Sequence, residues 1–126
     1  MLNQTGITKT SAITRKNILI APELAFSMSC KVANSNVVAG EDGRKMVKAG
    51  TPLVGDLEAR DTAFTVATSA DTPVGILLHD IDVTKGNANA SVVVFGFVDT
   101  SKLDSAVSAV LDASMKAKLP KITFVK

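Results

Sequence analysis

The 126-residue chain contains no tryptophan and no tyrosine, and its only aromatic residues are five phenylalanines. Hydrophobic residues still make up 46% of the sequence, so a core has to be built mainly from valine, isoleucine, leucine and alanine. A chain of this length and composition fits one folded domain. The shortage of aromatic rings argues against sites that stack bases or sugars, such as channels for single-stranded nucleic acid.

Cysteine is almost absent as well. Cys30 is the one cysteine, which excludes an intramolecular disulfide and fits synthesis in a reducing cytoplasm. We interpret it as a small apolar residue of a strand and not as a reactive thiol. Residues 1–17 lack the apolar centre of a signal peptide, and no stretch approaches the ~18 apolar residues of a membrane span. We therefore expect a soluble protein without a membrane partner.

Side chains that serve enzymes and metal sites are scarce. His79 is the only histidine, and it cannot share a strand face with its neighbour Asp80. Asp80 and Asp82 do share a face, but a calcium ion needs about six to eight oxygen ligands, and the spacing of a calcium loop is missing. The sequence contains neither a nucleophile elbow nor a glycine-rich phosphate loop. We predict no enzymatic activity, no cofactor and no metal.

Charges of the two signs are interspersed along the chain. Lysine and arginine number 14 against 12 aspartates and glutamates, which gives a net charge of +2. The densest basic places are the pairs Arg15 with Lys16 and Arg44 with Lys45. These pairs do not make the concentrated basic face of a nucleic-acid binder, so we expect no nucleic-acid partner.

The beginning of the chain differs in composition from the rest. Residues 1–17 hold four threonines and no aromatic residue, and we interpret them as an arm attached to a single globular β-rich domain, residues 18–126. Residues 7–13 are free of proline and prone to β structure. An extended segment of this kind can complete the edge of another protein's sheet, and a plain disordered tail is the alternative interpretation.

Strand signals fill the middle of the chain. In the alternating segment Phe26–Val32, we predict that Phe26, Met28 and Cys30 face the core. Asp42 and Gly43 predict a tight hairpin between residues 37–39 and 45–48. Further strands are predicted at residues 53–54, 64–67, 74–78, 80–83, 91–98 and 122–125. We expect residues 91–98 to pair antiparallel with residues 74–83.

One helix is predicted from residue 101 or 102 to about residue 118. Ser101 is placed to cap it, Asp104 suits its first turn, and Pro120 ends it. Its apolar stripe consists of Leu103, Ala106, Val107, Val110, Leu111 and Met115. The predicted fold class is therefore α+β and mostly β, a small barrel- or sandwich-like core with one C-terminal helix and an extended N-terminal arm.

Two short motifs, Thr51-Pro52-Leu53 and Val74-Gly75-Ile76-Leu77, precede the apolar run 90–98, the helical segment and residues 122–125. This succession resembles the small head decoration proteins of tailed bacteriophages, in particular their lambda-like branch, over roughly residues 48–126. The resemblance implies a structural protein that is made in the cytoplasm of the bacterial host and binds the outer surface of the assembled head. It also implies a homotrimer on the capsid.

The resemblance further implies that the arm adds to strands of the major capsid protein, which becomes the expected partner. The capsid-binding residues expected on this basis are Ile7, Thr8, Lys9, Thr10, Ser11, Ala12 and Ile13. Two alternatives are a head fibre or host-adhesion adaptor of the same β-rich type, and a small ligand-binding β-barrel. The second alternative needs a pocket with converging polar groups.

Overall fold

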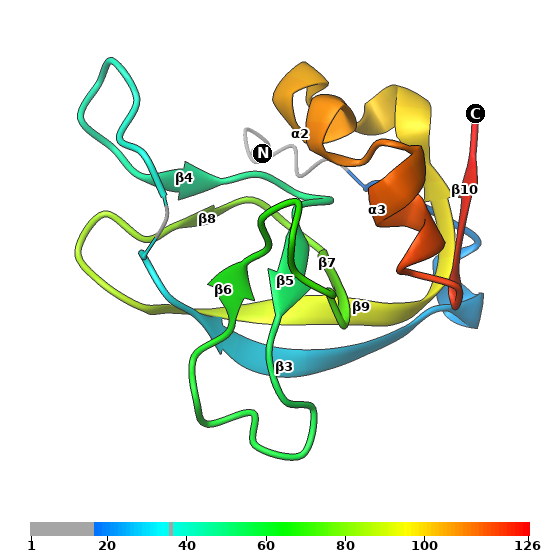
Figure 1. Cartoon of the computed structure of the whole chain (residues 1–126), viewed down its shortest axis with the longest axis horizontal. Coiled ribbons are helices and arrows are strands. Elements are labelled where there is room, and N and C mark those ends of the chain that lie inside the picture. The colour runs from blue at the N-terminus through cyan, green and yellow to red at the C-terminus, as the bar shows by residue number, and fades with distance from the viewer. Residues whose placement is uncertain (1–16, 36) are drawn as a thin grey trace, which may run out of the picture.

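The computed structural model describes residues 17–35 and 37–126, and it is built mostly of β-strands (Figure 1). The strands are β2 (Leu19–Ile20), β3 (Phe26–Val32), β4 (Met46–Val47), β5 (Pro52–Val54), β6 (Thr65–Val66), β7 (Gly75–Leu77), β8 (Ile81–Asp82), β9 (Ala88–Asp99) and β10 (Ile122–Val125). The helical elements are η1 (Pro22–Leu24), η2 (Thr100–Lys102), α2 (Ser105–Val110) and α3 (Ala113–Ala117). The predicted fold class, α+β and mostly β, is confirmed, and the main sheet is open along its path from β10 to β6.

The 12-residue strand β9 organises the main sheet, because four other strands pair with it. In its first part, β3 and β7 both lie opposite Val92 and Val93, so they occupy the two edges of β9. In its last part, β2 and β10 both lie opposite Phe97 and Val98 and again occupy both edges. The predicted antiparallel pairing of residues 91–98 with residues 74–78 is confirmed by the β7–β9 ladder.

Gly96 marks the place where β9 changes its partners and bends, as Figure 1 shows for the long yellow strand. Its φ is 154°, in a region that favours glycine. A side chain at this position would also meet Ala25, since an added Cβ would lie 3.1 Å from the Ala25 Cβ. The bend therefore depends on a residue without a side chain.

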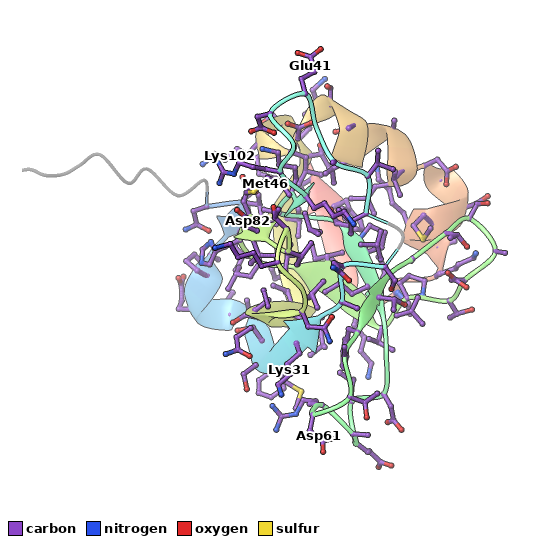
Figure 2. The ribbon with its side chains drawn as sticks, turned by 90° about the vertical axis from the view of Figure 1, so that its left-hand side faces the viewer. Lys31, Glu41, Met46, Asp61, Asp82 and Lys102 are labelled. Carbon is purple, nitrogen blue, oxygen red and sulfur yellow. The ribbon has the colours of Figure 1, made fainter. Side chains whose placement is uncertain are left out.

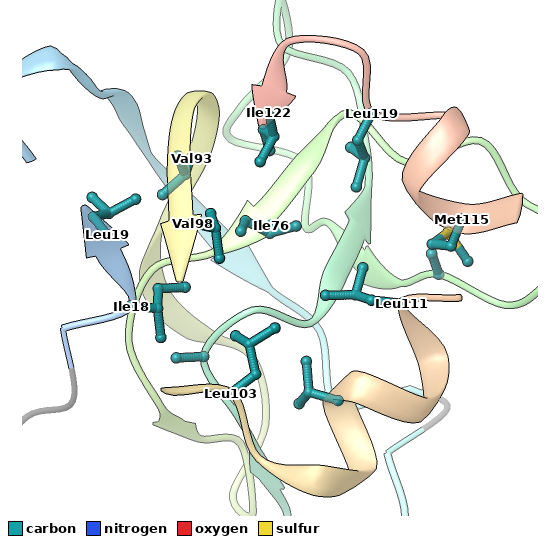
Figure 3. Packing of buried hydrophobic residues seen from close by; sticks show 13 residues of the cluster. Ile18, Leu19, Ile76, Val93, Val98, Leu103, Leu111, Met115, Leu119 and Ile122 are labelled. Atoms are coloured by element: carbon teal, nitrogen blue, oxygen red, sulfur yellow. The ribbon is translucent and has the colours of Figure 1, made fainter. Parts of the chain in front are cut away.

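The continuous apolar runs are explained by burial on both faces of the sheet. Val93 and Ile76 belong to one cluster of buried residues, whereas their neighbours Val92 and Leu77 belong to another. The first cluster lies under the helical segment, where Leu103, Leu111 and Met115 point toward the sheet (Figure 3). Full burial of each large aliphatic side chain contributes about 1.5–3 kcal/mol.

The predicted single C-terminal helix is wrong in one respect, since the segment forms the turn η2 and two short helices. Each element starts with its own aspartate cap: Asp99 accepts from Ser101 N, Asp104 from Ala106 N, and Asp112 from Met115 N. Aspartate is favoured at caps because its carboxylate satisfies backbone N–H groups that the first turn leaves unpaired. Ser101 is not the cap, and α3 ends at Ala117, before Pro120, as predicted.

The predicted apolar stripe is only partly buried. Leu103, Val107, Leu111 and Met115 lie in the core, whereas Ala106 is exposed and Val110 is 43% exposed. Both exposed residues belong to α2, which buries only Val107, so the predicted stripe is too wide on this helix.

The predicted hairpin turn is present, but its flanking residues do not pair as strands. Gly43 N donates to Gly40 O at 2.9 Å, and Gly40 N donates to Arg44 O at 2.8 Å. β4 pairs with β8 to form a separate two-stranded sheet, so the expected pairing of residues 80–83 with β9 is also wrong. The β7–β9 ladder ends at Leu77, and the chain then leaves β9, so that β8 pairs with β4.

Phe26 does not face the core and is 57% exposed. The register between β3 and β9 shifts between Phe26 and Ser27, so Phe26 leaves the alternation of the rest of the strand. Met28 is half-buried and Cys30 is buried, as the alternation predicts.

Gly75 lies so close to β9 that alanine should not fit there. An added Cβ would be 2.4 Å from the backbone oxygen of Val93, which cannot swing away as a flexible side chain can. We expect Gly75→Ala to lower the free energy of unfolding by ~1–3 kcal/mol or more. The measurement is urea denaturation, with Gly40→Ala as the control, because the Cβ there meets only the Asp42 side chain at 3.3 Å and Arg44 O at 3.7 Å. Equal losses in the two variants would contradict the close approach of β7 and β9.

Candidate functional site

The expected capsid-binding residues Ile7 to Ile13 lie outside the described residues. The structure does describe the place where the arm joins the body. Ile18 is fully buried, and its backbone oxygen accepts from Asp99 N at 2.8 Å. Leu19 N donates to the Asn17 side chain at 3.1 Å, and Leu19 and Ile20 then pair with β9 as β2. The arm therefore leaves the body from a strand held on the last part of β9.

The two motifs that carry the family resemblance are hydrogen-bonded neighbours. Pro52 of β5 lies opposite Ile76 of β7, and Leu53 lies opposite Gly75. Leu77 N donates to Thr51 O at 2.9 Å. Motifs about twenty residues apart thus form one antiparallel unit, and β7 joins this unit to β9.

In the part of the chain that the structure describes, four of the six exposed large hydrophobic residues lie near the place where β9 bends. Ile20, Leu24, Phe26 and Phe95 are 42%, 57%, 57% and 48% exposed, and we call them the corner patch. Phe26 and Phe95 are partners in the register of β3 with β9, and Ile20 lies opposite Phe97. Exposed apolar side chains that gather in one place are typical of interaction surfaces.

The other two exposed hydrophobic residues, Val38 and Val110, border an apolar groove of about 410 Å³ between α2, β4 and the β5–β6 pair. The groove is lined by Val37, Val38, Met46, Val47, Lys48, Thr51, Pro52, Val66, Ala67, Ala106, Val107 and Val110. Its polar side chains already have partners in the body. Thr51 Oγ1 donates to Lys48 O at 2.6 Å, and Lys48 Nζ lies 3.8 Å from Asp80 Oδ2. The groove therefore offers mainly apolar contacts.

Asp80 and Asp82 brace the small β4–β8 sheet. Asp80 accepts from Ala49 N at 2.7 Å, and Asp82 Oδ2 lies 3.3 Å from Arg44 Nη2. Asp82 lies beside Met46 in Figure 2, in agreement with the β4–β8 register. Hydrogen bonds from Thr84 and then the Arg44 guanidinium hold the pKa of Asp82 below its usual value. The contacts of both carboxylates thus stabilise the ends of β4 and β8.

Within residues 17–35 and 37–126, three or more histidine, cysteine, aspartate or glutamate side chains gather nowhere in an arrangement that fits a metal ion. The helices in this part of the chain are too short and too polar to cross a membrane. Cys30 is 5% exposed, and burial raises the pKa of its thiol, an effect that the Arg60 guanidinium partly opposes. A buried, protonated thiol fits the interpretation of Cys30 as a small apolar residue.

The corner patch and the groove were missed at the level of sequence. Phe26 belongs to an alternating segment, and nothing in that segment signals the register shift that exposes it. The groove joins residues 37–38, β4, β6 and α2, which only the tertiary fold brings together. The pair Phe95 and Phe97 around Gly96 is the one available signal, since glycine within a strand marks a bend or a close approach.

Neither a protein-family model nor any curated protein sequence matches this chain.

Three aspartates should make the stability of the protein depend on acid pH. Hydrogen bonds lower the pKa values of their carboxyl groups. Thr68 donates to Asp71, Thr84 donates to Asp82, and Ser101 donates to Asp99. A carboxylate whose pKa is lower in the folded state stabilises that state above the unfolded pKa of about 3.9, and the contribution is lost as pH falls through the folded value.

We therefore expect the urea midpoint to fall as pH is lowered from 5 to about 2. The variant D71N/D82N/D99N keeps an oxygen acceptor at each position but does not titrate there, so its midpoint should fall less over the same range. An identical fall in wild type and variant would assign the acid sensitivity to other groups.

Proposed function

We propose that this protein is a capsid decoration protein of a tailed bacteriophage, which binds the outer surface of the assembled head and stabilises it. The proposed partner is the major capsid protein, and the proposed location is the virion. The proposal requires no catalytic residue, no cofactor, and no contact with nucleic acid or membrane.

One structural observation supports the proposal in addition to the sequence resemblance. The motifs Thr51-Pro52-Leu53 and Val74-Gly75-Ile76-Leu77 form the paired strands β5 and β7, and β7 lies on the strand β9. Gly75 has a structural reason to be glycine, since a Cβ would collide with the backbone of β9. The resemblance therefore concerns one packed unit of the fold, which supports common architecture with the decoration proteins.

The arm supplies the proposed main anchor. Residues 7–13 alternate, with Ile7, Lys9, Ser11 and Ile13 on one side of an extended chain. Main-chain hydrogen bonds to a capsid strand would provide affinity, and the alternating side chains would provide specificity. Ordering costs about 1–2 kcal/mol per residue in backbone entropy, so the capsid edge has to offset a large penalty.

Charge also favours a particular kind of capsid edge. The arm contains Lys9, Arg15 and Lys16, whereas every one of the 12 acidic residues lies after residue 17. An acidic surface on the capsid would attract such an arm, and salt would weaken the attraction.

We expect the full chain to sediment with expanded capsids and not with unassembled coat subunits, because the lattice sites exist only after assembly. Deletion of residues 1–14 should abolish this binding. Thr10→Pro removes one ladder donor and should weaken binding without lowering the melting temperature, whereas the matched Thr10→Ser variant should bind as wild type.

Unchanged binding after the deletion would exclude the arm as the anchor. Binding to free coat subunits as strong as binding to capsids would refute lattice-specific decoration. Attachment to host cells without attachment to capsids would favour the fibre or adhesion function.

We further propose a homotrimer on the capsid. Its contacts would be apolar and weak, because the exposed apolar residues of the body are valine, isoleucine, leucine and phenylalanine, and the chain lacks the tryptophan and tyrosine that dominate tight interfaces. Light scattering should show monomers at low concentration, and cryo-electron microscopy of decorated shells should show three copies around each threefold position. Single copies away from any symmetry axis would contradict the trimer.

A further inference from the structure

The outer edge of β3 carries backbone groups that point away from β9. Phe64 N donates to Lys31 O at 2.7 Å, and Phe64 lies outside the ladder between β3 and β9. The backbone groups of Lys31 therefore face outward. Since successive residues of a strand direct these groups to alternate sides, those of Ser29 and Ser27 face outward too. Met28 and Cys30 supply the hydrogen bonds to β9.

Little of the described chain covers this edge. The Arg60 guanidinium donates through Nη1 to Ser29 O at 2.9 Å and to Ser29 Oγ at 3.2 Å. Phe64 closes the far end through Lys31 O and Ala33 N. Among residues 17–35 and 37–126, the N–H groups of Ser27 and Ser29 meet no hydrogen-bond acceptor. An edge with free N–H groups is a template for another strand.

The side chains around this edge define what kind of strand fits. Phe26 and Phe95 of the corner patch lie at one end and are more than 45% exposed. At the other end, Lys31, Arg60 and Asp61 line a shallow polar cleft, and Figure 2 shows Lys31 and Asp61 at the same end of the molecule. An incoming strand with an apolar side chain near Phe26 and a carboxylate near Arg60 complements both ends.

The charge of the incoming strand distinguishes between two possible occupants of this edge, the arm of a second copy and a segment of the capsid protein. A strand that takes over Ser29 O releases the Arg60 guanidinium, and a carboxylate on that strand could then pair with it. The arm of a second copy does not supply one, because residues 1–16 contain three basic residues and no acidic one. An acidic segment of the capsid protein does supply one, and it also suits the basic arm.

The place where the arm is attached supports the same occupant. The arm ends at Asn17, directly before β2, and Ile20 of β2 lies opposite Phe97 while Phe26 of β3 lies opposite Phe95. The start of β3 is thus about two β9 residues, or ~7 Å, from the end of β2. A single capsid surface can contact both the arm and the corner patch.

We infer that the open edge of β3 accepts an extended, acidic segment of the capsid protein as an added strand, and that Arg60 turns from Ser29 to a carboxylate of that segment. This inference rests on the proposed function. It adds a second, folded contact to the one made by the arm.

The test compares two pairs of full-length variants in sedimentation with expanded capsids. Ser29→Pro removes the outward N–H and leaves the ladder to β9 intact, whereas Ser29→Thr keeps that N–H. Loss of one such hydrogen bond should weaken binding about threefold to tenfold. Arg60→Glu should weaken binding further, and Arg60→Lys, which keeps the charge, should lie close to wild type.

Hydrogen exchange followed by mass spectrometry gives a second readout that needs no substitution. A peptide covering residues 26–31 of the wild-type protein should become protected when the protein binds capsids. If wild type binds but this peptide stays unprotected and the Arg60→Glu variant binds equally well, the inference is wrong and the proposed function stands. If wild type does not bind capsids, both are wrong.

Discussion

The structure depends on β9, which has a partner on each edge at Val92 and Val93 and again at Phe97 and Val98. β3 and β7 occupy the edges in the first part, and β2 and β10 occupy them in the last part. Residues far apart in the sequence, from Leu19 to Val125, are held together by this one strand. The bend at Gly96 divides the two parts and brings Ala25 onto the strand.

Burial on both faces of this sheet supplies the rest of the stability. Ile76 and Val93 pack under the helical segment, and Leu77 and Val92 pack on the opposite side. Apart from the buried Phe64, the buried members of the two clusters are aliphatic residues, methionine and cysteine, which agrees with the absence of tryptophan and tyrosine from the chain. The surfaces left outside are the corner patch, the apolar groove and the edge of β3.

Much of this fold follows from the sequence, because strands that are buried on one or both faces have a strong apolar signature. β3 has the predicted bounds, and β7 and β9 form the predicted pair. The single helix was wrong because Asp104 and Asp112 act as caps, a choice between cap and interior that composition alone does not decide. The exposure of Phe26 results from a register shift, and β4 pairs with β8 although the two strands lie far apart in the sequence, which no local pattern signals.

The candidate site likewise has one part that the sequence predicts and one part that only the fold reveals. The alternation of residues 7–13 can be recognised from the sequence. The open edge of β3, in contrast, results from the pairing of β3 with β9 and from the position of Arg60. Edges are properties of a whole sheet, and a single strand sequence does not reveal them. The link between the arm and this edge is the short distance along β9 from Phe97 to Phe95.

The most direct measurement is a cryo-electron microscopy reconstruction of expanded capsids saturated with the full-length protein. The account predicts the body on the outer surface, with residues 7–13 forming an added strand on the major capsid protein. Empty lattice sites at saturating protein, or a bound body whose arm makes no contact with the capsid protein, would contradict it.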